Sequence, residues 1–221
     1  MVRGSLDLPD DGLDIALQGF GNAGSWFAKA AVEAGHKIVA VSDSSGMVRN
    51  DDGLDVNEIF KLKADGGSIT DLDGDSGDAE NLIAEECDVL ALAALGGAVD
   101  ASNADRLNCK AVVEIANIPI LAEADEPLRK RGIEVVPDIL ANGGGVTVSH
   151  AEWAQNREGL AWSEERVQDY LEERMKTAAK RVTDLMQEKD IDMRTAAYGA
   201  AMLRLCGAIS AAGTAEDFRT A

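Results

Sequence analysis

The sequence predicts an α/β fold, with a doubly wound, mostly parallel sheet followed by C-terminal helices. Short, nearly continuous apolar runs alternate with helix-like segments as far as residue 138, and from Ile139 onward the pattern is helical only. Apolar runs of this kind are typical of parallel strands that helices cover on both faces. Right-handed crossovers between such strands produce a doubly wound sheet.

A glycine-rich turn joins the first predicted strand to the first predicted helix. The strand runs from Asp14 to Gln18, and the helix runs from Asn22 to Ala34, where Gly35 ends it. The turn between them reads Gly19-Phe20-Gly21-Asn22-Ala23-Gly24, which is a GxGxxG pattern, and a second strand follows over 38–42. This order of elements is Rossmann-like and predicts a dinucleotide site.

Each part of this turn has a physical role in holding a dinucleotide. Gly19 allows the tight turn out of the strand, Gly21 lets the backbone approach a pyrophosphate, and Gly24 lets the helix lie close on the sheet. The free amides and the positive dipole end of the helix then meet the phosphates. Asp43 follows about twenty residues past the glycines, where an acid accepts hydrogen bonds from the adenosine ribose. The alternative is a tight turn that binds nothing, with Asp43 merely capping a turn.

The remaining elements complete the sheet region and the helical region. We predict a strand over 47–48, a helix capped by Asp55 that runs to about Lys63, an exposed loop over 71–78, a helix over 79–85, a strand over 88–91, a helix from Ser102 to Leu107, a strand over 111–114, a helix over 122–131, a strand over 134–136, a helix from Ser163 to about Lys189 and a last helix from Arg194 to about Ala212. Gly143-Gly144-Gly145 interrupts a helix-like run, and each glycine destabilises a helix by about 1 kcal/mol relative to alanine. Glycines kept at such a cost indicate that the backbone lies close to a ligand or to another helix.

The charge of the chain narrows the class of protein. The 221 residues include 40 acidic and 21 basic side chains, for a formal net charge of -19, which argues against general nucleic-acid binding. No apolar run approaches the roughly twenty residues that a membrane helix needs, and no secretory signal is visible. The scattered acid excess favours adaptation to high salt, as in a halophile, because counter-ions screen the repulsion. The alternative is a solvated surface that resists association.

Cysteine and histidine usage indicates a compartment and argues against a metal site. Cys87, Cys109 and Cys206 each lie in an apolar run and form no CxxC pair. We interpret them as small buried side chains in a reducing, cytoplasmic setting. The only histidines are His36 and His150, so no metal site is assigned.

The chain divides into one main domain with short flanking segments. Met1–Ser5 resembles the remnant of an expression tag. The predicted domain covers residues 6–213, with its helical segment beginning at about residue 139, and residues 214–221 form a tail.

Several motifs resemble the coenzyme-binding, C-terminal domain of glutamate dehydrogenases, within the wider family of amino-acid dehydrogenases. They are the run 15–24, Val41-Ser42-Asp43-Ser44, Asp52-Gly53-Leu54-Asp55, the run 137–142 followed by 144–149, Glu152-Trp153, Gln155-Asn156, Trp162-Ser163 and Arg194-Thr195-Ala196-Ala197-Tyr198. The resemblance covers the chain from about Leu6 to Gly213. It implies an enzyme that interconverts L-glutamate with 2-oxoglutarate and ammonia by hydride transfer to a nicotinamide, in a cleft between two domains.

The resemblance also implies roles for individual residues. Phe20, Gly21, Asn22 and Ala23 would meet the pyrophosphate, Asp43 and Ser44 would flank the adenosine ribose, Ala93 and Ala94 would run along the cofactor, Asn117 would lie near the nicotinamide ribose, Asn142 would contact the carboxamide, and Val146 and Ser149 would help form the substrate pocket. Other interpretations stay open, since Asn142 could cap a helix, Asn117 could be a turn residue and Ser149 an ordinary helix serine.

No catalytic residue is assigned, because the family's lysine, aspartate and most substrate contacts belong to an N-terminal domain that this sequence does not include. We therefore expect a deliberately cut fragment that binds the cofactor without turning over glutamate. The expected partners are a nicotinamide dinucleotide, an amino-acid substrate only together with the N-terminal domain, and further copies in a homo-oligomeric parent enzyme. Neither nucleic acid nor a membrane is expected as a partner.

The departures from the family pattern lie near the expected nicotinamide. Ile115 and Ile118 stand where the family usually has glycines, Gly143 where it has alanine, and His150 where a tyrosine is common. Because a β-branched residue does not easily take positive φ or admit a close ligand, either that loop follows another path or nicotinamide binding is altered.

Three choices of function remain open from the sequence. NAD is the expected cofactor, with NADP as the alternative, because Asp43 repels a 2′-phosphate while Ser44 and Ser45 bring no positive charge. A leucine, valine or phenylalanine dehydrogenase is the alternative enzyme. A non-catalytic, nucleotide-binding regulatory paralogue is the alternative from another class, and Ile115 and Ile118 motivate it.

Overall fold

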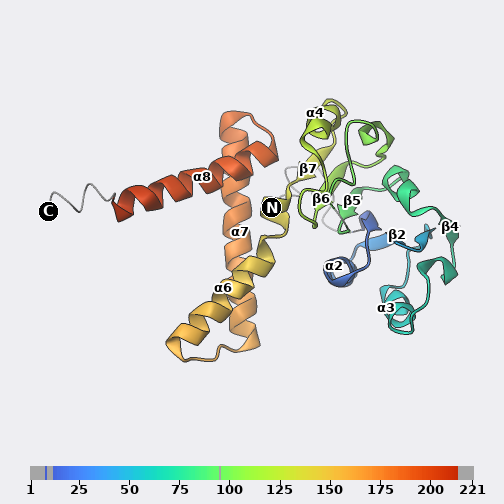
Figure 1. Cartoon of the computed structure of the whole chain (residues 1–221), viewed down its shortest axis with the longest axis horizontal. Helices are drawn as coiled ribbons and strands as arrows, with labels where there is room; N and C mark the ends of the chain where they lie inside the picture. The colour runs from blue at the N-terminus through green and yellow to red at the C-terminus, as the bar shows by residue number, and fades with distance from the viewer. Residues whose placement is uncertain (1–7, 9–11, 95, 214–221) are drawn as a thin grey trace. The chain divides into compact units, whose positions relative to one another are not determined.

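The computed structural model describes residue 8, residues 12–94 and residues 96–213. These residues divide into two compact units, one that ends at Asn142 and one that begins at Gly143 (Figure 1). The segments expected to be a tag remnant and a tail, Met1–Ser5 and 214–221, lie outside the described residues.

The first unit is built on a seven-stranded sheet in the order β4-β3-β2-β1-β5-β6-β7. Its strands are β1 (Asp14–Gln18), β2 (Lys37–Asp43), β3 (Gly46–Arg49), β4 (Asp75–Gly77), β5 (Val89–Leu92), β6 (Ala111–Glu114) and β7 (Glu134–Val136). Strands β2, β1, β5, β6 and β7 pair in parallel, whereas β3 and β4 are antiparallel additions at one edge. The predicted doubly wound, mostly parallel sheet is therefore confirmed.

Helices and short 3₁₀ turns connect these strands. They are α2 (Asn22–Glu33), α3 (Val56–Ala64), α4 (Ala122–Lys130) and α5 (Asp138–Ala141), with the 3₁₀ turns η1 (Ile69–Asp71), η2 (Ala79–Ala84) and η3 (Ala104–Arg106). The predicted cap of α3 is confirmed, because the Asp55 carboxylate accepts hydrogen bonds from the amides of Asn57 and Glu58.

Three predictions for this unit were wrong. The helix expected over 79–85 is the 3₁₀ segment η2 rather than an α-helix. Residues 75–77 form the exposed edge strand β4, paired with β3, where a loop was expected. The helix expected from Ser102 to Leu107 is only the turn η3, because the Ser102 hydroxyl donates to Asp100 Oδ1 at 2.6 Å instead of capping a helix.

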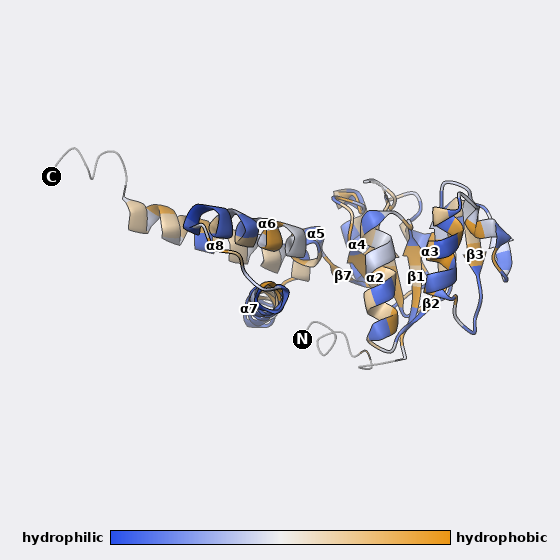
Figure 2. Ribbon diagram, turned by 90° about the horizontal axis from the view of Figure 1, so that it is seen from below, coloured by the Kyte–Doolittle hydropathy of each residue, from blue (hydrophilic) through white to orange (hydrophobic). Residues whose placement is uncertain are grey.

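The central parallel strands β1, β2, β5 and β6 are buried on both faces, as the apolar runs predict, whereas the edge strand β4 is exposed. Successive residues of β1 enter different core clusters: Ile15 and Leu17 pack on the side of α2 and α3, and Ala16 packs with Leu90 and Leu128 on the other side. Figure 2 shows the strands as the apolar layer of this unit. Packing on both faces holds these strands in position, and the candidate site is built at their carboxyl ends.

The second unit consists of helices α6 (Gly143–Glu158), α7 (Glu164–Lys189) and α8 (Met193–Ala212) in its described part. Ser163 caps α7, as predicted, by accepting a hydrogen bond from the Arg166 amide at 3.3 Å. Asp192 caps α8 by accepting from the Thr195 amide at 2.9 Å. Within the described residues, no helix has the length and apolar character to cross a membrane.

The three glycines 143–145 form the first turn of α6 rather than a crowded interruption. A Cβ added at Gly143 would lie 3.8 Å from Met175 Sδ, and one added at Gly144 would lie 3.6 Å from Leu171 Cδ1, which are ordinary contacts. At Gly145 no heavy atom would lie within 4 Å. These glycines are therefore not crowded against another helix within the described residues.

The cysteines follow the prediction only in part. Cys87 and Cys109 are partly buried, and burial raises the pKa of the Cys87 thiol to about 12 and that of Cys109 to about 11, so both stay protonated. Cys206 was expected to be buried, but it is exposed on α8. The apolar run that surrounds it forms an exposed helix face rather than a core.

Candidate functional site

The glycine turn lies where the order of the parallel strands reverses. Strand β1 has β2 on one side and β5 on the other, and in open α/β sheets ligands bind outside the carboxyl ends of the strands at such a point. Gly19 leaves β1 with a φ of +93°, and its amide donates to the Ser42 carbonyl of β2 at 2.7 Å. A Cβ at Gly24 would overlap the Gly19 carbonyl oxygen, so only glycine fits there.

The start of helix α2 is open. Gly21 is its N-cap and provides no side chain to cap it, and the first turn holds no acidic residue. The first backbone bond of the helix joins the Ser25 amide to the Gly21 carbonyl at 3.0 Å, so the amides of residues 22–24 have no acceptor within the helix. A Cβ at Gly21 would meet no heavy atom within 4 Å, and Asn22 and Ala23 are exposed. Free amides at the positive end of a helix dipole are suited to bind an anion such as a phosphate.

Phe20 can contribute only its backbone to this anion site. The residue is 7% exposed, and its ring packs edge-on against the Phe60 ring, with the ring centroids 5.3 Å apart. The ring therefore anchors the turn on the core of the unit.

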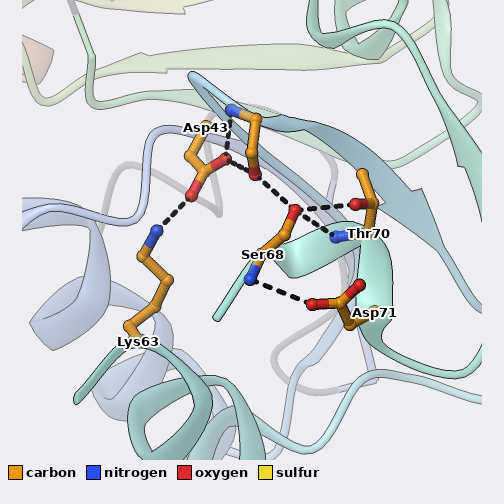
Figure 3. A network of polar contacts seen from close by, with 6 residues as sticks. Asp43, Lys63, Ser68, Thr70 and Asp71 are labelled. Atoms are coloured by element: carbon orange, nitrogen blue, oxygen red, sulfur yellow. Dashed lines mark hydrogen bonds and ion pairs between the residues drawn. The ribbon is translucent and has the colours of Figure 1, made fainter. Parts of the chain in front are cut away.

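Asp43 lies at the end of β2, beside the glycine turn, and it has a cationic partner that sequence reasoning missed. Its Oδ2 accepts from Lys63 Nζ at 2.6 Å, and its Oδ1 accepts from the amide and hydroxyl of Ser45 at 2.8 Å and 2.5 Å (Figure 3). Burial acts to raise the pKa of Asp43, but the hydrogen bonds from Lys63 and Ser45 and the charge of Lys63 outweigh it, so the pKa is lowered. The carboxylate stays ionised and able to accept hydrogen bonds from a diol.

A small polar network holds the Ser45 side of this site in place. The Ser68 hydroxyl donates to Ser45 Oγ at 2.9 Å and lies 2.6 Å from Thr70 Oγ1 (Figure 3). The Ser68 amide donates to Asp71 Oδ2 at 3.2 Å, which closes a capping box at the start of η1. Ser44, the other residue expected at the ribose, lies between Asp43 and Ser45 in the sequence and is exposed.

The end of β5 borders the glycine turn from the other side. The Ala93 amide donates to the Gln18 carbonyl at 2.8 Å, which extends the pairing of β1 and β5 to the turn itself. A Cβ at Gly19 would come within 3.0 Å of the backbone of Ala93 and of Ala94 Cα. The structure thus brings Ala93 and Ala94 next to the glycine turn.

The two asparagines expected near the nicotinamide meet each other. Asn142 Nδ2 donates to Asn117 Oδ1 at 2.8 Å, although the two residues are far apart in the sequence. Asn117 is exposed in the loop that follows β6, and Asn142 ends α5. Their free amide and carbonyl groups can donate to and accept from a polar ligand.

Ile118 takes the backbone conformation that glycine adopts most readily. Its φ is +48°, its side chain is 60% exposed, and its amide donates to Asp138 Oδ2 at 2.8 Å. Asp138 is itself held by a hydrogen bond from its amide to the buried carboxylate of Glu114 at 2.8 Å. Ile115, in contrast, has no positive φ and packs partly buried against the core. Ile118 is therefore strained, whereas Ile115 is not. The hydrogen bonds from the Ile118 amide to Asp138 and from the Asp138 amide to Glu114 hold Ile118 in this conformation.

We expect Ile118→Gly to raise the free energy of unfolding by roughly 0.5–1 kcal/mol, because relief of the left-handed strain exceeds the entropy that glycine adds to the unfolded chain. Urea unfolding measures the change. Ile139→Gly is the matched control, since Ile139 is partly exposed in α5 and has no positive φ, so that variant should lose stability. Equal destabilisation by both substitutions would contradict the strain at Ile118.

The two residues expected in the substrate pocket lie in the second unit. Val146 and Ser149 are on α6 and both are exposed, Val146 by 71%. The residues expected to hold the cofactor all lie in the first unit. No group of three or more His, Cys, Asp or Glu residues in the described part of the chain could hold a metal ion.

Comparison with known proteins gives the family. A family model described as glutamate/leucine/phenylalanine/valine dehydrogenase matches residues 6–213. The chain belongs to this dehydrogenase family. The glutamate dehydrogenase of Thermotoga maritima is 46% identical over 201 residues, which make up 90% of this chain and 48% of that protein.

Solved structures of this dehydrogenase family share the fold. The hetero-hexameric glutamate dehydrogenase from Thermus thermophilus, in a leucine-bound form, matches with a TM-score of 0.89 and 33% identity over 96% of this chain and 50% of that chain. Glutamate dehydrogenase from Peptoniphilus asaccharolyticus matches with a TM-score of 0.81 and 30% identity over the same shares of the two chains. The chain spans about half the length of the relatives it matches.

Proposed function

We propose that the chain is the dinucleotide-binding part of an NAD(P)-dependent glutamate dehydrogenase, with NAD as the cofactor. The open start of α2 carries this proposal: at Gly21 an added Cβ would occupy free space next to unpaired helix amides. The bound nicotinamide supplies hydride transfer. Residues 19–24 would hold the pyrophosphate, Asp43 and Ser44 the adenosine ribose, Ala93 and Ala94 the middle of the cofactor, and Asn117 and Asn142 the nicotinamide end.

The complete reaction needs more than this chain. In the full enzyme we propose oxidative deamination of L-glutamate to 2-oxoglutarate and ammonia, with Val146 and Ser149 in the substrate pocket. The chain alone binds cofactor without turnover, and no catalytic residue is assigned to it. The identity to a glutamate dehydrogenase favours glutamate over leucine, valine or phenylalanine as the substrate.

We also propose that the parent enzyme assembles from several copies. Helix α8 exposes large apolar side chains that water solvates poorly, namely Tyr198, Met202, Leu203, Leu205 and Ile209. The Thermus thermophilus relative is a hetero-hexamer, whereas a homo-oligomer is proposed here. Free cysteines are consistent with assembly in the cytoplasm.

A regulatory module that binds nucleotides without catalysis is the second candidate, and the exposed, strained Ile118 is the observation that favours it. Titration with NADH, followed by nicotinamide fluorescence, separates the two. A dehydrogenase domain binds NADH more tightly than ADP, because the nicotinamide end adds contacts at Asn117 and Asn142. ADP binding as tight as that of NADH would favour the module, and binding of neither would overturn both.

Lys63 should affect the choice between the two cofactors. Its ammonium group contacts Asp43 at 2.6 Å, so it can offset the repulsion between that carboxylate and a 2′-phosphate. We expect Lys63→Gln to weaken NADPH binding about fivefold relative to NADH binding, which corresponds to roughly 1 kcal/mol. Competition titrations with both cofactors measure the ratio. Lys61→Gln, on the exposed side of the same helix, serves as the control, and an equal change in that variant would contradict the role of Lys63.

The net charge of -19 leads us to propose adaptation to high salt. The Debye length falls from about 10 Å at 0.1 M salt to about 3 Å at 1 M, which screens repulsion between the acidic side chains. We therefore expect the thermal unfolding midpoint to rise by several degrees as KCl increases to molar concentrations. A midpoint that stays constant or falls across the series would remove this proposal.

A further inference from the structure

We propose that the groove between α7 and α8 binds a small phosphate-bearing polyanion. The groove has a volume of about 600 Å³, within the range of small-molecule sites, and Arg174, Arg181 and Arg204 line it. It lies wholly within the second unit, whereas the glycine turn belongs to the first. This inference goes beyond the proposed cofactor site and does not depend on it.

The arginines reach the groove because of helix periodicity. Arg174 and Arg181 are seven residues apart on α7 and therefore lie on one face, roughly 10 Å apart along the helix axis. Arg204 approaches from α8, on the same face as Ala200. The helices pack closely at one point of the groove, since a Cβ at Gly199 would come within 3.2 Å of Leu185 Cδ2. The result is a groove with guanidinium groups from both helices around it.

The two carboxylates that line the groove are paired with lysines, which leaves the arginines available to bind an anion. Asp184 also lines the groove, but its carboxylate accepts from Lys180 at 2.7 Å and 2.8 Å. Glu188 likewise pairs with Lys189 at 2.8 Å. In the part of the chain that the structure describes, Arg181 and Arg204 form no ion pair.

Several other arginines of the described chain also form no ion pair, and what sets Arg174, Arg181 and Arg204 apart is that all three line one groove. Arg174 has an aromatic contact instead, with its Cζ 4.9 Å from the centroid of the Tyr170 ring. A cluster of guanidinium groups that the acid excess has not neutralised favours an anion from outside the chain as its partner.

The chemistry of the groove favours phosphate and a small ligand. Guanidinium groups present paired N–H donors that match phosphate oxygens in a bidentate arrangement, and groups on two helices can share one polyphosphate. Asp184 and Glu188 at the same groove would repel an extended acidic protein surface. A compact polyanion can contact the arginines while avoiding both carboxylates.

Isothermal titration calorimetry of the full 221-residue chain with inorganic tripolyphosphate tests the proposal. Because the start of α2 can also take phosphate, the titration is repeated in Gly21→Val, which should keep the groove site. We expect Arg181→Gln/Arg204→Gln to weaken the groove site at least tenfold. Arg181→Lys/Arg204→Lys, which keeps the charge but loses the paired donors, should weaken it by less. Circular dichroism confirms that each variant is folded.

The control is Arg129→Gln/Lys130→Gln, which removes the same charge from the exposed surface of α4. It should change the tripolyphosphate affinity by less than twofold. The proposal is overturned if Gly21→Val alone abolishes the binding, if the control weakens it as much as the groove variant does, or if the groove variant binds normally. Citrate is titrated in parallel, and an affinity equal to that of tripolyphosphate would overturn the assignment to phosphate.

Discussion

Gly21→Val should abolish NADH binding while leaving the fold intact. The valine side chain would occupy the space next to the unpaired amides of residues 22–24, where the pyrophosphate must approach the backbone. We expect the affinity to fall at least about 100-fold, which is roughly 2.7 kcal/mol. The fold should tolerate the change because a Cβ at Gly21 meets no protein atom within 4 Å, and loss of the glycine N-cap costs about 1 kcal/mol. Nicotinamide fluorescence and urea unfolding measure the two quantities.

The matched control for this experiment is Gly207→Val. Gly207 lies in α8, and a Cβ there also meets no heavy atom within 4 Å. This variant should bind NADH as the unchanged chain does. If Gly21→Val kept its affinity for NADH, the phosphates would have to lie elsewhere.

Gly24→Ala should have the largest effect on stability. In an exposed helix the change from glycine to alanine is stabilising by about 1 kcal/mol. At Gly24 the new Cβ overlaps the Gly19 carbonyl oxygen and comes within 3.3 Å of Ala93 Cβ, so α2 must move away from the turn. Because the atom that it meets is backbone, we expect a loss of about 3 kcal/mol, at the upper end of typical overpacking costs.

Urea unfolding of Gly24→Ala and Gly207→Ala gives the comparison directly. Both positions are helical glycines, so helix propensity alone predicts a gain in stability at each. Opposite signs are expected, with a gain at Gly207 and a loss at Gly24. A gain at Gly24 would mean that the glycine turn does not pack against α2 as described.

The sequence predicted the structure best where the residue types required by the backbone conformation coincide with the hydrophobic pattern of a strand or helix. Strand β1, the glycine turn and helix α2 were predicted within one residue of their observed bounds, because a buried strand, a positive φ and a close helix start each need particular residue types. Strand β4 was missed for the opposite reason. Its Asp75-Ser76-Gly77 is polar and exposed, and only pairing with β3 makes it a strand.

The contacts that tertiary packing creates were harder to predict. Lys63 lies 20 residues from Asp43, so a search among the residues next to Asp43 could not find it. The one available signal is that Lys63 is a basic residue in the last turn of α3. Asn117 and Asn142 were each predicted from the resemblance, but their mutual hydrogen bond follows from how the loop after β6 meets the end of α5. Exposure of Cys206 could not be predicted, because an apolar helix has the same sequence pattern whether or not a partner covers it.

The central claim is that the open start of α2 receives the pyrophosphate of a nicotinamide dinucleotide. The most direct measurement follows the backbone amide resonances of the ¹⁵N-labelled chain during titration with NADH. The account predicts the largest shifts at Gly21, Asn22 and Ala23, with smaller shifts at Asp43 and Ala94. Saturable NADH binding that leaves the resonances of residues 21–23 unchanged would contradict it.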